Sequence, residues 1–141
     1  MSSSAALHDA KEYSTKLLAR RWLTEKVFEI ELTRPPSFQF TPGQRIRFYH
    51  ETMQRDYSLL TTPADLTLAL CVFNVEKGQF SPVLAEAEIG MKFSFTGPYG
   101  YFTYRPSQRP AIFVATGTGI APFLSIGRSG VTEFILLHGV R

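Results

Sequence analysis

The stretch AIFVATGTGIAPFLSI, residues 111–126, decides how this chain is organised. AIFVAT is a continuous apolar run, which is typical of a buried parallel strand. A glycine-containing turn follows it, then a helix-like segment, and EFILLHGV at residues 133–140 is a second buried run. Strand, turn, helix and strand in this order predict a βαβ unit, the opening of a doubly wound α/β domain.

The chain before this stretch follows a different pattern, with short β-like runs separated by turn signals such as RPPS, TPGQ and TGPYG. One helix interrupts them, with Ser81 expected as its N-cap and Pro82 at its first helical position. An open sheet of short strands would leave its edges uncovered, so we predict a small closed antiparallel barrel of six strands. The expected strands are Thr15–Trp22, Val27–Thr33, Gln44–Tyr49, Asp56–Leu60, Leu66–Phe73 and Met91–Thr96, with a short seventh at Phe102–Tyr104.

The predicted fold class is therefore mostly β, a six-stranded antiparallel barrel followed by an incomplete α/β segment. We expect a polar tail over residues 1–12, the barrel domain over 13–106, and the first part of a nucleotide-binding α/β domain over 107–141. Two strands and one helix cannot cover both faces of such a sheet, so this last part is expected to be truncated. Its uncovered apolar runs predict self-association.

The amino-acid composition argues against several classes of protein. With 141 residues, 44% hydrophobic and 19% charged, the chain is typical of a globular domain. The lone Cys71 excludes an internal disulfide and argues against a metal cluster. A net charge of +3 without clustered basic residues argues against nucleic acid as a partner. The short apolar runs and the polar start argue against a membrane span and a signal peptide, so a cytoplasmic location is expected.

The first candidate site is Arg55-Asp56-Tyr57-Ser58 on a predicted strand. Residues two apart on a strand share a face, so Arg55 and Tyr57 point one way, and Asp56 and Ser58 the other. A cation, a flat aromatic ring and a small hydroxyl could meet a phosphate, a planar ring and a ring nitrogen of one ligand. A surface arginine and a packed tyrosine on a half-exposed strand would also explain the pattern.

Other arginines, Arg45 and Arg47, also lie on strand-like stretches. The planar fork of arginine suits a phosphate or a carboxylate. Each of them could equally lie on a solvated strand face.

The second candidate site is Gly78, Gln79, Phe80 and Ser81, directly before the predicted helix. Free N–H groups at a helix start, next to a glycine that allows close backbone approach, can bind an anion. A plain turn with an N-cap is the alternative.

The third candidate site is Gly117, Thr118 and Gly119, between a buried strand and a helix. Glycine-rich turns in this position let the phosphates of a nucleotide approach the backbone. The spacing differs from GxGxxG because Ala121 and Pro122 follow, so a phosphate site and a simple turn both stay open.

Six stretches in this order resemble the flavin-dependent ferredoxin–NADP reductase family, and together they span nearly all of the chain after its tail. The matching stretches are FQFTPGQRIRF (38–48), RDYSLLTTP (55–63), EKGQFSPVL (76–84), FTGPYGYF (95–102), VATGTGIAPFLS (114–125) and LLHGVR (136–141). The resemblance implies a flavin-binding barrel followed by an NAD(P)-binding α/β domain. FAD is the implied cofactor, with FMN as an alternative, and NAD(P)H is the implied co-substrate.

The resemblance also implies residue roles. Arg55 would pair with a flavin phosphate, Tyr57 would lie against the isoalloxazine, and Ser58 would approach flavin N5, so Tyr57 and Ser58 are the implied catalytic residues. Leu59, next in the motif, would belong to the same cofactor site. The stretch Gly78–Ser81 would hold the FAD pyrophosphate.

Gly117, Thr118 and Gly119 would by the same resemblance meet the nicotinamide nucleotide. The implied function is electron transfer between NAD(P)H and a one-electron carrier protein, either ferredoxin or flavodoxin. Two alternatives stay open from the sequence: a non-catalytic flavin-binding module that docks on a partner protein, and a barrel that binds no flavin.

Overall fold

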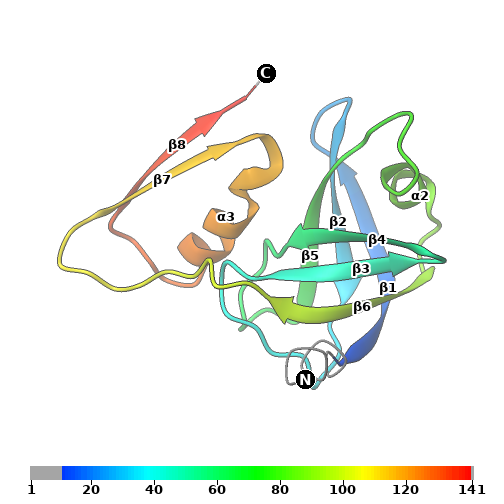
Figure 1. Ribbon diagram of the computed structural model, residues 1–141, viewed down its shortest axis with the longest axis horizontal. Helices are drawn as coiled ribbons and strands as arrows, with labels where there is room; N and C mark the ends of the chain where they lie inside the picture. The colour runs from blue at the N-terminus through cyan, green and yellow to red at the C-terminus, as the bar shows by residue number, and fades with distance from the viewer. Residues whose placement is uncertain (1–10, 141) are drawn as a thin grey trace, which may run out of the picture.

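The structure is a computed structural model that describes residues 11–140 (Figure 1). Most of the expected polar tail, residues 1–10, lies outside the described residues, and Glu12 already belongs to the first strand. The elements are β1 (Glu12–Trp22), β2 (Val27–Thr33), β3 (Arg45–His50), β4 (Met53–Ser58), β5 (Thr67–Phe73), α2 (Ser81–Glu86), β6 (Lys92–Tyr99), β7 (Ala111–Thr116), the 3₁₀ helix η1 (Gly117–Ile120), α3 (Ala121–Arg128) and β8 (Phe134–Gly139).

Six antiparallel strands form one curled sheet in the order β4-β3-β6-β1-β2-β5, which confirms the predicted sheet of six antiparallel strands. The sheet is not a closed barrel, and that part of the prediction is wrong. The edge strands β4 and β5 meet only at the bridge between Leu59 and Leu70, beside which the Leu60 N–H donates to the Ala69 carbonyl at 2.9 Å. Strand β4 ends at Ser58, too early to run alongside β5.

Several strand predictions differ from the structure: β1 begins three residues before the predicted Thr15, and β6 ends three residues after the predicted Thr96. Strand β4 begins at Met53 rather than Asp56, because a tight turn with Glu51 at φ +53° pairs Met53 with His50. The expected strand Phe102–Tyr104 does not form. Instead, the Phe102 ring packs edge-on against Phe123 of α3 at 5.4 Å between centroids. This segment therefore contacts the following unit and adds no strand to the sheet.

Aromatic side chains fill the inside of the curled sheet. Strand β2 alternates buried and half-buried residues, as its period of two predicts. Helix α2 lies at one end of the curled sheet, and its N-cap residue Phe80 and its Leu84 belong to the core (Figure 1). Each fully buried side chain of this size stabilises the fold by about 1.5–3 kcal/mol. The largest of these are Phe28, Phe38, Phe48, Phe80 and Phe95.

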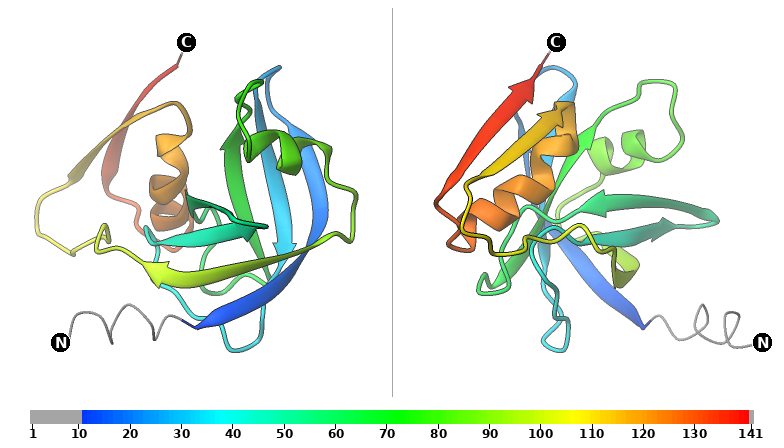
Figure 2. Two further views of the ribbon diagram at one scale, coloured as in Figure 1. Left: turned by 45° about the vertical axis from the view of Figure 1, so that its right-hand side comes forward. Right: turned by 60° about the vertical axis from the view of Figure 1, so that its left-hand side comes forward.

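The second unit is the predicted βαβ arrangement, with β7 and β8 parallel and α3 packed on one side of them (Figure 2). Phe113 of β7 stacks on Phe123 of α3 at 4.7 Å. The opposite face of this small sheet is apolar and more than half exposed, and it is formed by Ile112, Val114, Ile135 and Leu137. Self-association through this face stays a prediction.

A buried hydrogen bond ties α3 to the chain that leaves β4. The Ser125 hydroxyl, which is fully buried, donates to the Thr61 carbonyl at 2.6 Å. Beside it, Ala121 packs against Leu60 and Ala69. The strand that carries the first candidate site is therefore joined directly to the helix that follows the glycine turn.

We expect Ser125→Ala to lower the free energy of unfolding by about 1–3 kcal/mol, because it leaves the buried Thr61 carbonyl without a donor. Urea denaturation measures this loss. Ser129→Ala is the matched control, since the Ser129 hydroxyl bonds only to Ile126 of its own helix. Equal stability of the two variants would contradict the role given to the Ser125 bond.

Candidate functional site

Strand β4 presents its residues on alternating faces, as predicted. Arg55 lies opposite Phe48 and Tyr57 lies opposite Ile46, so both face the side on which the core is built. The Arg55 guanidinium is exposed and donates only to the Gln54 carbonyl, at 2.7 Å. Among the described residues it has no carboxylate partner. It is therefore a cation available to a ligand.

The first two candidate sites meet at Phe80. The Tyr57 ring lies 6.2 Å from the Phe80 ring, and the Arg55 guanidinium carbon lies 6.0 Å above the same ring. Phe80 is itself buried and packs edge-on against Phe48. The structure thus brings together a cation, a phenol ring and the start of α2, which are separated by more than twenty residues in the sequence.

Burial raises the pKa of Tyr57 to about 12, although the nearby Arg55 guanidinium acts in the opposite direction. The phenol therefore keeps its proton throughout the neutral range. An uncharged, half-buried ring is suited to lie against a planar aromatic ligand.

The opposite face of β4 holds an ion cluster. Asp56 accepts hydrogen bonds from Arg47 Nε at 2.9 Å and from Arg45 Nε at 3.0 Å. Burial opposes ionisation of Asp56, but the two guanidinium groups outweigh it and hold the pKa of this carboxyl below its usual value. Arg47 also lies over the Tyr99 ring at 4.9 Å. The acceptor for these two arginines is thus a carboxylate of the same chain.

Ser58, which ends the first site, and the following Leu59 lie at the junction of the two units. Ser58 ends β4 and is half-buried. The Leu59 side chain is fully buried in the core, and its N–H donates to the Gln44 carbonyl at 3.2 Å. Arg128 of α3 donates to the Leu60 carbonyl at 3.4 Å. Leu59 therefore anchors the strand end, while Ser58 stays accessible beside it.

Ser81 is not the N-cap of α2, contrary to the prediction. Phe80 occupies that position, and Pro82 is the second helical residue instead of the first. The buried Ser81 hydroxyl accepts a hydrogen bond from the Val75 N–H at 2.8 Å. The loop folds back on itself there, so the hydroxyl stabilises the loop rather than the helix end.

The backbone before α2 offers free donors. A Cβ at Gly78 would lie 2.9 Å from the Val75 carbonyl oxygen, so this glycine serves the tight turn of the loop. Within residues 11–140, no group accepts a hydrogen bond from the N–H groups of Gln79, Phe80 and Ser81. Unpaired backbone donors beside an exposed arginine fit the phosphate oxygens of a nucleotide.

The third candidate site forms η1 rather than a simple turn. Gly117 adopts a left-handed φ of +53°, and a Cβ at Gly117 or Gly119 would meet no atom within 4 Å. Thr118 lies between them and is half-buried. The His138 ring nitrogen Nε2 lies 2.9 Å from the Gly117 carbonyl oxygen. This contact could not be predicted from the sequence, because nothing in the spacing of a glycine turn and a histidine on the following strand indicates it.

The third site lies between the second unit and the sheet. The 3₁₀ helix η1 contacts β5, β7, β8 and α3. It leads from β7 into α3 (Figure 2), and the space beside Gly117 and Gly119 is open. Ala121, which directly follows η1, packs against Leu60, two residues after Ser58.

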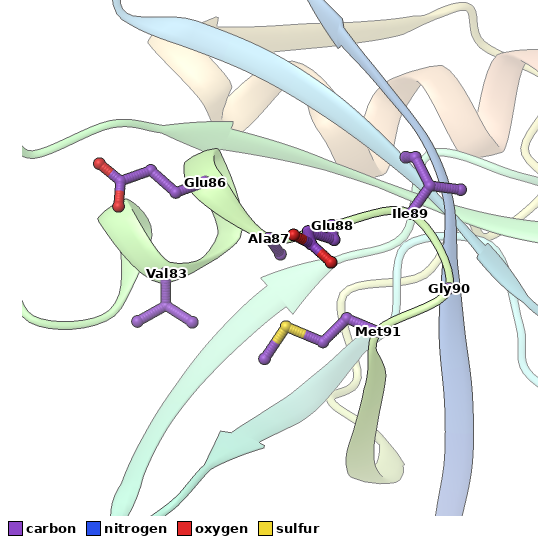
Figure 3. A pocket seen from close by; sticks show the side chains of 7 residues that line it. All are labelled: Val83, Glu86, Ala87, Glu88, Ile89, Gly90 and Met91. Carbon is purple, nitrogen blue, oxygen red and sulfur yellow. The ribbon is translucent and has the colours of Figure 1, made fainter.

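An open hollow of about 680 Å³ lies at the other end of α2 (Figure 3). It is lined by Val83, Glu86, Ala87, Glu88, Ile89, Gly90 and Met91. None of the candidate residues lines it, and its acidic side chains point outward rather than to a common centre. The hollow therefore has no part in the candidate site.

Two further properties concern only the part of the chain that the structure describes. None of its helices is long and apolar enough to cross a membrane. No three of its histidine, cysteine, aspartate and glutamate side chains lie close enough together to hold a metal ion.

Residues 23–104 match the family of oxidoreductase FAD-binding domains. The electron transfer component of 2-halobenzoate 1,2-dioxygenase from Burkholderia cepacia is 36% identical over 123 residues, which cover 80% of this chain and 36% of that protein. Ferredoxin–NADP reductase B from Sorangium cellulosum is 33% identical over 137 residues, covering 92% of this chain and 56% of that protein. The chain thus spans between about a third and just over half of the length of these relatives.

A solved structure shares the same fold. The ferredoxin NADP+ reductase from Neisseria gonorrhoeae with bound FAD and NADP superposes with a TM-score of 0.78 at 28% identity. The superposition covers 92% of this chain and 58% of that one.

The raised pKa of Tyr57 predicts an alkaline loss of stability. Above pH 10 an unfolded tyrosine releases its proton while the folded Tyr57 keeps it to about pH 12, so the free energy of unfolding falls as the pH rises between these values. At pH 11 the loss is about 1.4 kcal/mol. Urea denaturation at pH 9 and pH 11 should show a smaller loss for Tyr57→Phe than for the wild type. Tyr101→Phe, at a side chain that is 96% exposed, is the control and should behave like the wild type.

Proposed function

Because the chain belongs to the family of oxidoreductase FAD-binding domains, we propose that it is the FAD-binding part of an electron-transfer oxidoreductase working between NAD(P)H and a one-electron carrier protein. FAD supplies the redox chemistry when bound, accepting two electrons as hydride and releasing them singly. The observation that carries the proposal is the meeting of Arg55, Tyr57 and the start of α2 around Phe80.

These residues fit the parts of FAD. The exposed Arg55 guanidinium and the unpaired N–H groups of Gln79, Phe80 and Ser81 are donors for the pyrophosphate. The neutral Tyr57 ring offers a flat, half-buried surface for the isoalloxazine. A cation and several backbone donors next to an aromatic ring match a ligand that is planar at one end and anionic further along.

Ser58 is proposed as the residue beside flavin N5. It follows Tyr57 on the strand, so it lies where β4 turns toward α3 and the glycine-bearing η1. A hydroxyl there can hold a hydrogen bond to the ring nitrogen and orient the donor. Tyr57 and Ser58 are thus the proposed catalytic residues.

Gly117, Thr118 and Gly119 are proposed to meet the nicotinamide nucleotide. The open space above both glycines supports this assignment, because a backbone without side chains admits phosphate and ribose closely. The buried Ser125 bond to Thr61 would hold this loop at a constant distance from the flavin strand.

The partner is proposed to be a small electron carrier of the ferredoxin or flavodoxin type. One relative is named as the electron transfer component of a dioxygenase and another as a ferredoxin–NADP reductase, and both belong to electron-transfer systems. Either carrier accepts electrons one at a time.

A second candidate function is a flavin-binding module that docks on another protein without turning over NAD(P)H. The exposed apolar face of β7 and β8 favours it, since such a face is typical of an interaction surface. Oxidation of NADPH or NADH with ferricyanide as acceptor distinguishes the two candidates. Sustained oxidation by the chain supports the reductase, and flavin binding without oxidation supports the module.

Arg55→Ala should weaken FAD affinity about tenfold or more, because charge-assisted hydrogen bonds to a phosphate contribute roughly 1.5–3 kcal/mol each. Quenching of flavin fluorescence on titration measures the Kd. Arg21→Ala is the matched control, since Arg21 is exposed and pairs with Glu29. A wild-type Kd in Arg55→Ala would remove this assignment, and failure of the wild-type chain to bind FAD would refute the proposed function.

Ser58→Ala should leave FAD bound and slow its reduction by NADPH by about tenfold or more, since the hydroxyl contributes mainly in the transition state. Stopped-flow absorbance at the flavin band measures the rate. Ser94→Ala, at another half-buried strand serine, serves as the control. Reduction of the Ser58 variant at the wild-type rate would contradict the catalytic role.

A further inference from the structure

Arg20 is a charged residue on the core-facing side of its strand. It lies on β1 directly opposite Ile30 of β2, whose side chain is fully buried in the core. Arg20 itself is half-buried. An arginine on the core side of a sheet needs acceptors for its guanidinium, because burial without hydrogen bonds is costly.

Those acceptors lie at the end of α2. Arg20 Nη1 donates to the Leu84 carbonyl at 3.1 Å and to the Ala87 carbonyl at 2.7 Å. The last carbonyl groups of a helix lack partners within the helix. Helix α2 has no basic residue in its last turn, and Ala87 at its C-cap, with φ −57° and ψ 138°, does not adopt the left-handed form that often closes a helix. Arg20 therefore caps α2 from a neighbouring strand.

The opposite end of α2 carries the candidate flavin site. The helix has six residues, too few to be stable without external contacts. Leu84 fixes its middle in the core, and Phe80 fixes its start against Tyr57 and beneath Arg55. Arg20 is the polar contact that holds the remaining end.

We propose that Arg20 is a positioning residue for flavin binding, which caps α2 and so holds Phe80 and the preceding backbone in place next to Arg55 and Tyr57. This inference rests on the proposed function, since it concerns the affinity of the same site. Arg20 itself touches neither Arg55 nor Tyr57; it acts through the helix.

The next residue in the chain provides a matched comparison. Arg21 points to the other side of β1, its side chain is 73% exposed, and its guanidinium lies 3.3 Å from Glu29. Arg20 and Arg21 have the same charge and adjacent positions, and only Arg20 contacts α2. Their variants therefore separate a general effect of charge from an effect on the helix.

The test compares Arg20→Met, Arg20→Lys and Arg21→Met in the full chain by fluorescence titration with FAD and with riboflavin. Arg20→Met should raise the Kd for FAD about tenfold, whereas Arg21→Met should leave it within twofold of the wild type. Arg20→Lys should lie between them, because an ammonium group can still donate to one carbonyl. Riboflavin lacks the phosphates that Arg55 is proposed to bind, so its Kd should rise less than that of FAD.

Each result that differs from these expectations has a single interpretation. An FAD Kd within twofold of the wild type in a folded Arg20→Met variant would overturn the inference. Equal losses for FAD and riboflavin would also overturn it, since they would indicate a general structural effect. If Arg20→Met does not fold, the FAD Kd of Arg20→Lys is compared with that of Arg21→Met. A higher Kd for Arg20→Lys supports the inference, and equal Kd values overturn it. A wild-type chain that binds neither flavin would instead refute the proposed function.

Discussion

The packing of Phe80 against Phe48 and Tyr57 is the contact on which the proposed flavin site depends. The ring is buried in the core of the curled sheet, yet it also begins α2 and supports the Arg55 guanidinium. One side chain thus belongs to the core, the helix and the site together. Because the core is closely packed, the position of the cation above the ring is set by the same contacts that stabilise the fold.

The early end of β4 has a second consequence. If β4 had continued along β5, the sheet would have closed over the segment that contains Leu60 and Thr61. Instead, the carbonyl groups of these two residues accept hydrogen bonds from Arg128 and Ser125 of α3. The opening in the sheet is therefore the place where the two units join, directly after Ser58.

Four arginines of the curled sheet show how the environment assigns different roles to one residue type. Arg45 and Arg47 share the carboxylate of Asp56, and Arg20 donates to the end of α2. Arg55 has no acidic partner among the described residues and faces solvent beside Tyr57. It is the arginine of the four that is free to bind an anionic ligand.

Local patterns in the sequence were enough to predict the six strands of the sheet, the alternation that puts Arg55 and Tyr57 on one face, and the βαβ unit around Gly117 and Gly119. These features follow from local periodicity and turn chemistry, which neighbouring residues specify. Only the tertiary structure decided that the sheet stays open, that Ser81 bonds to Val75 instead of capping α2, and that Arg20 reaches the end of that helix. A period of two shows which face a side chain occupies, but its partner on that face comes from a distant part of the chain and depends on how the elements pack.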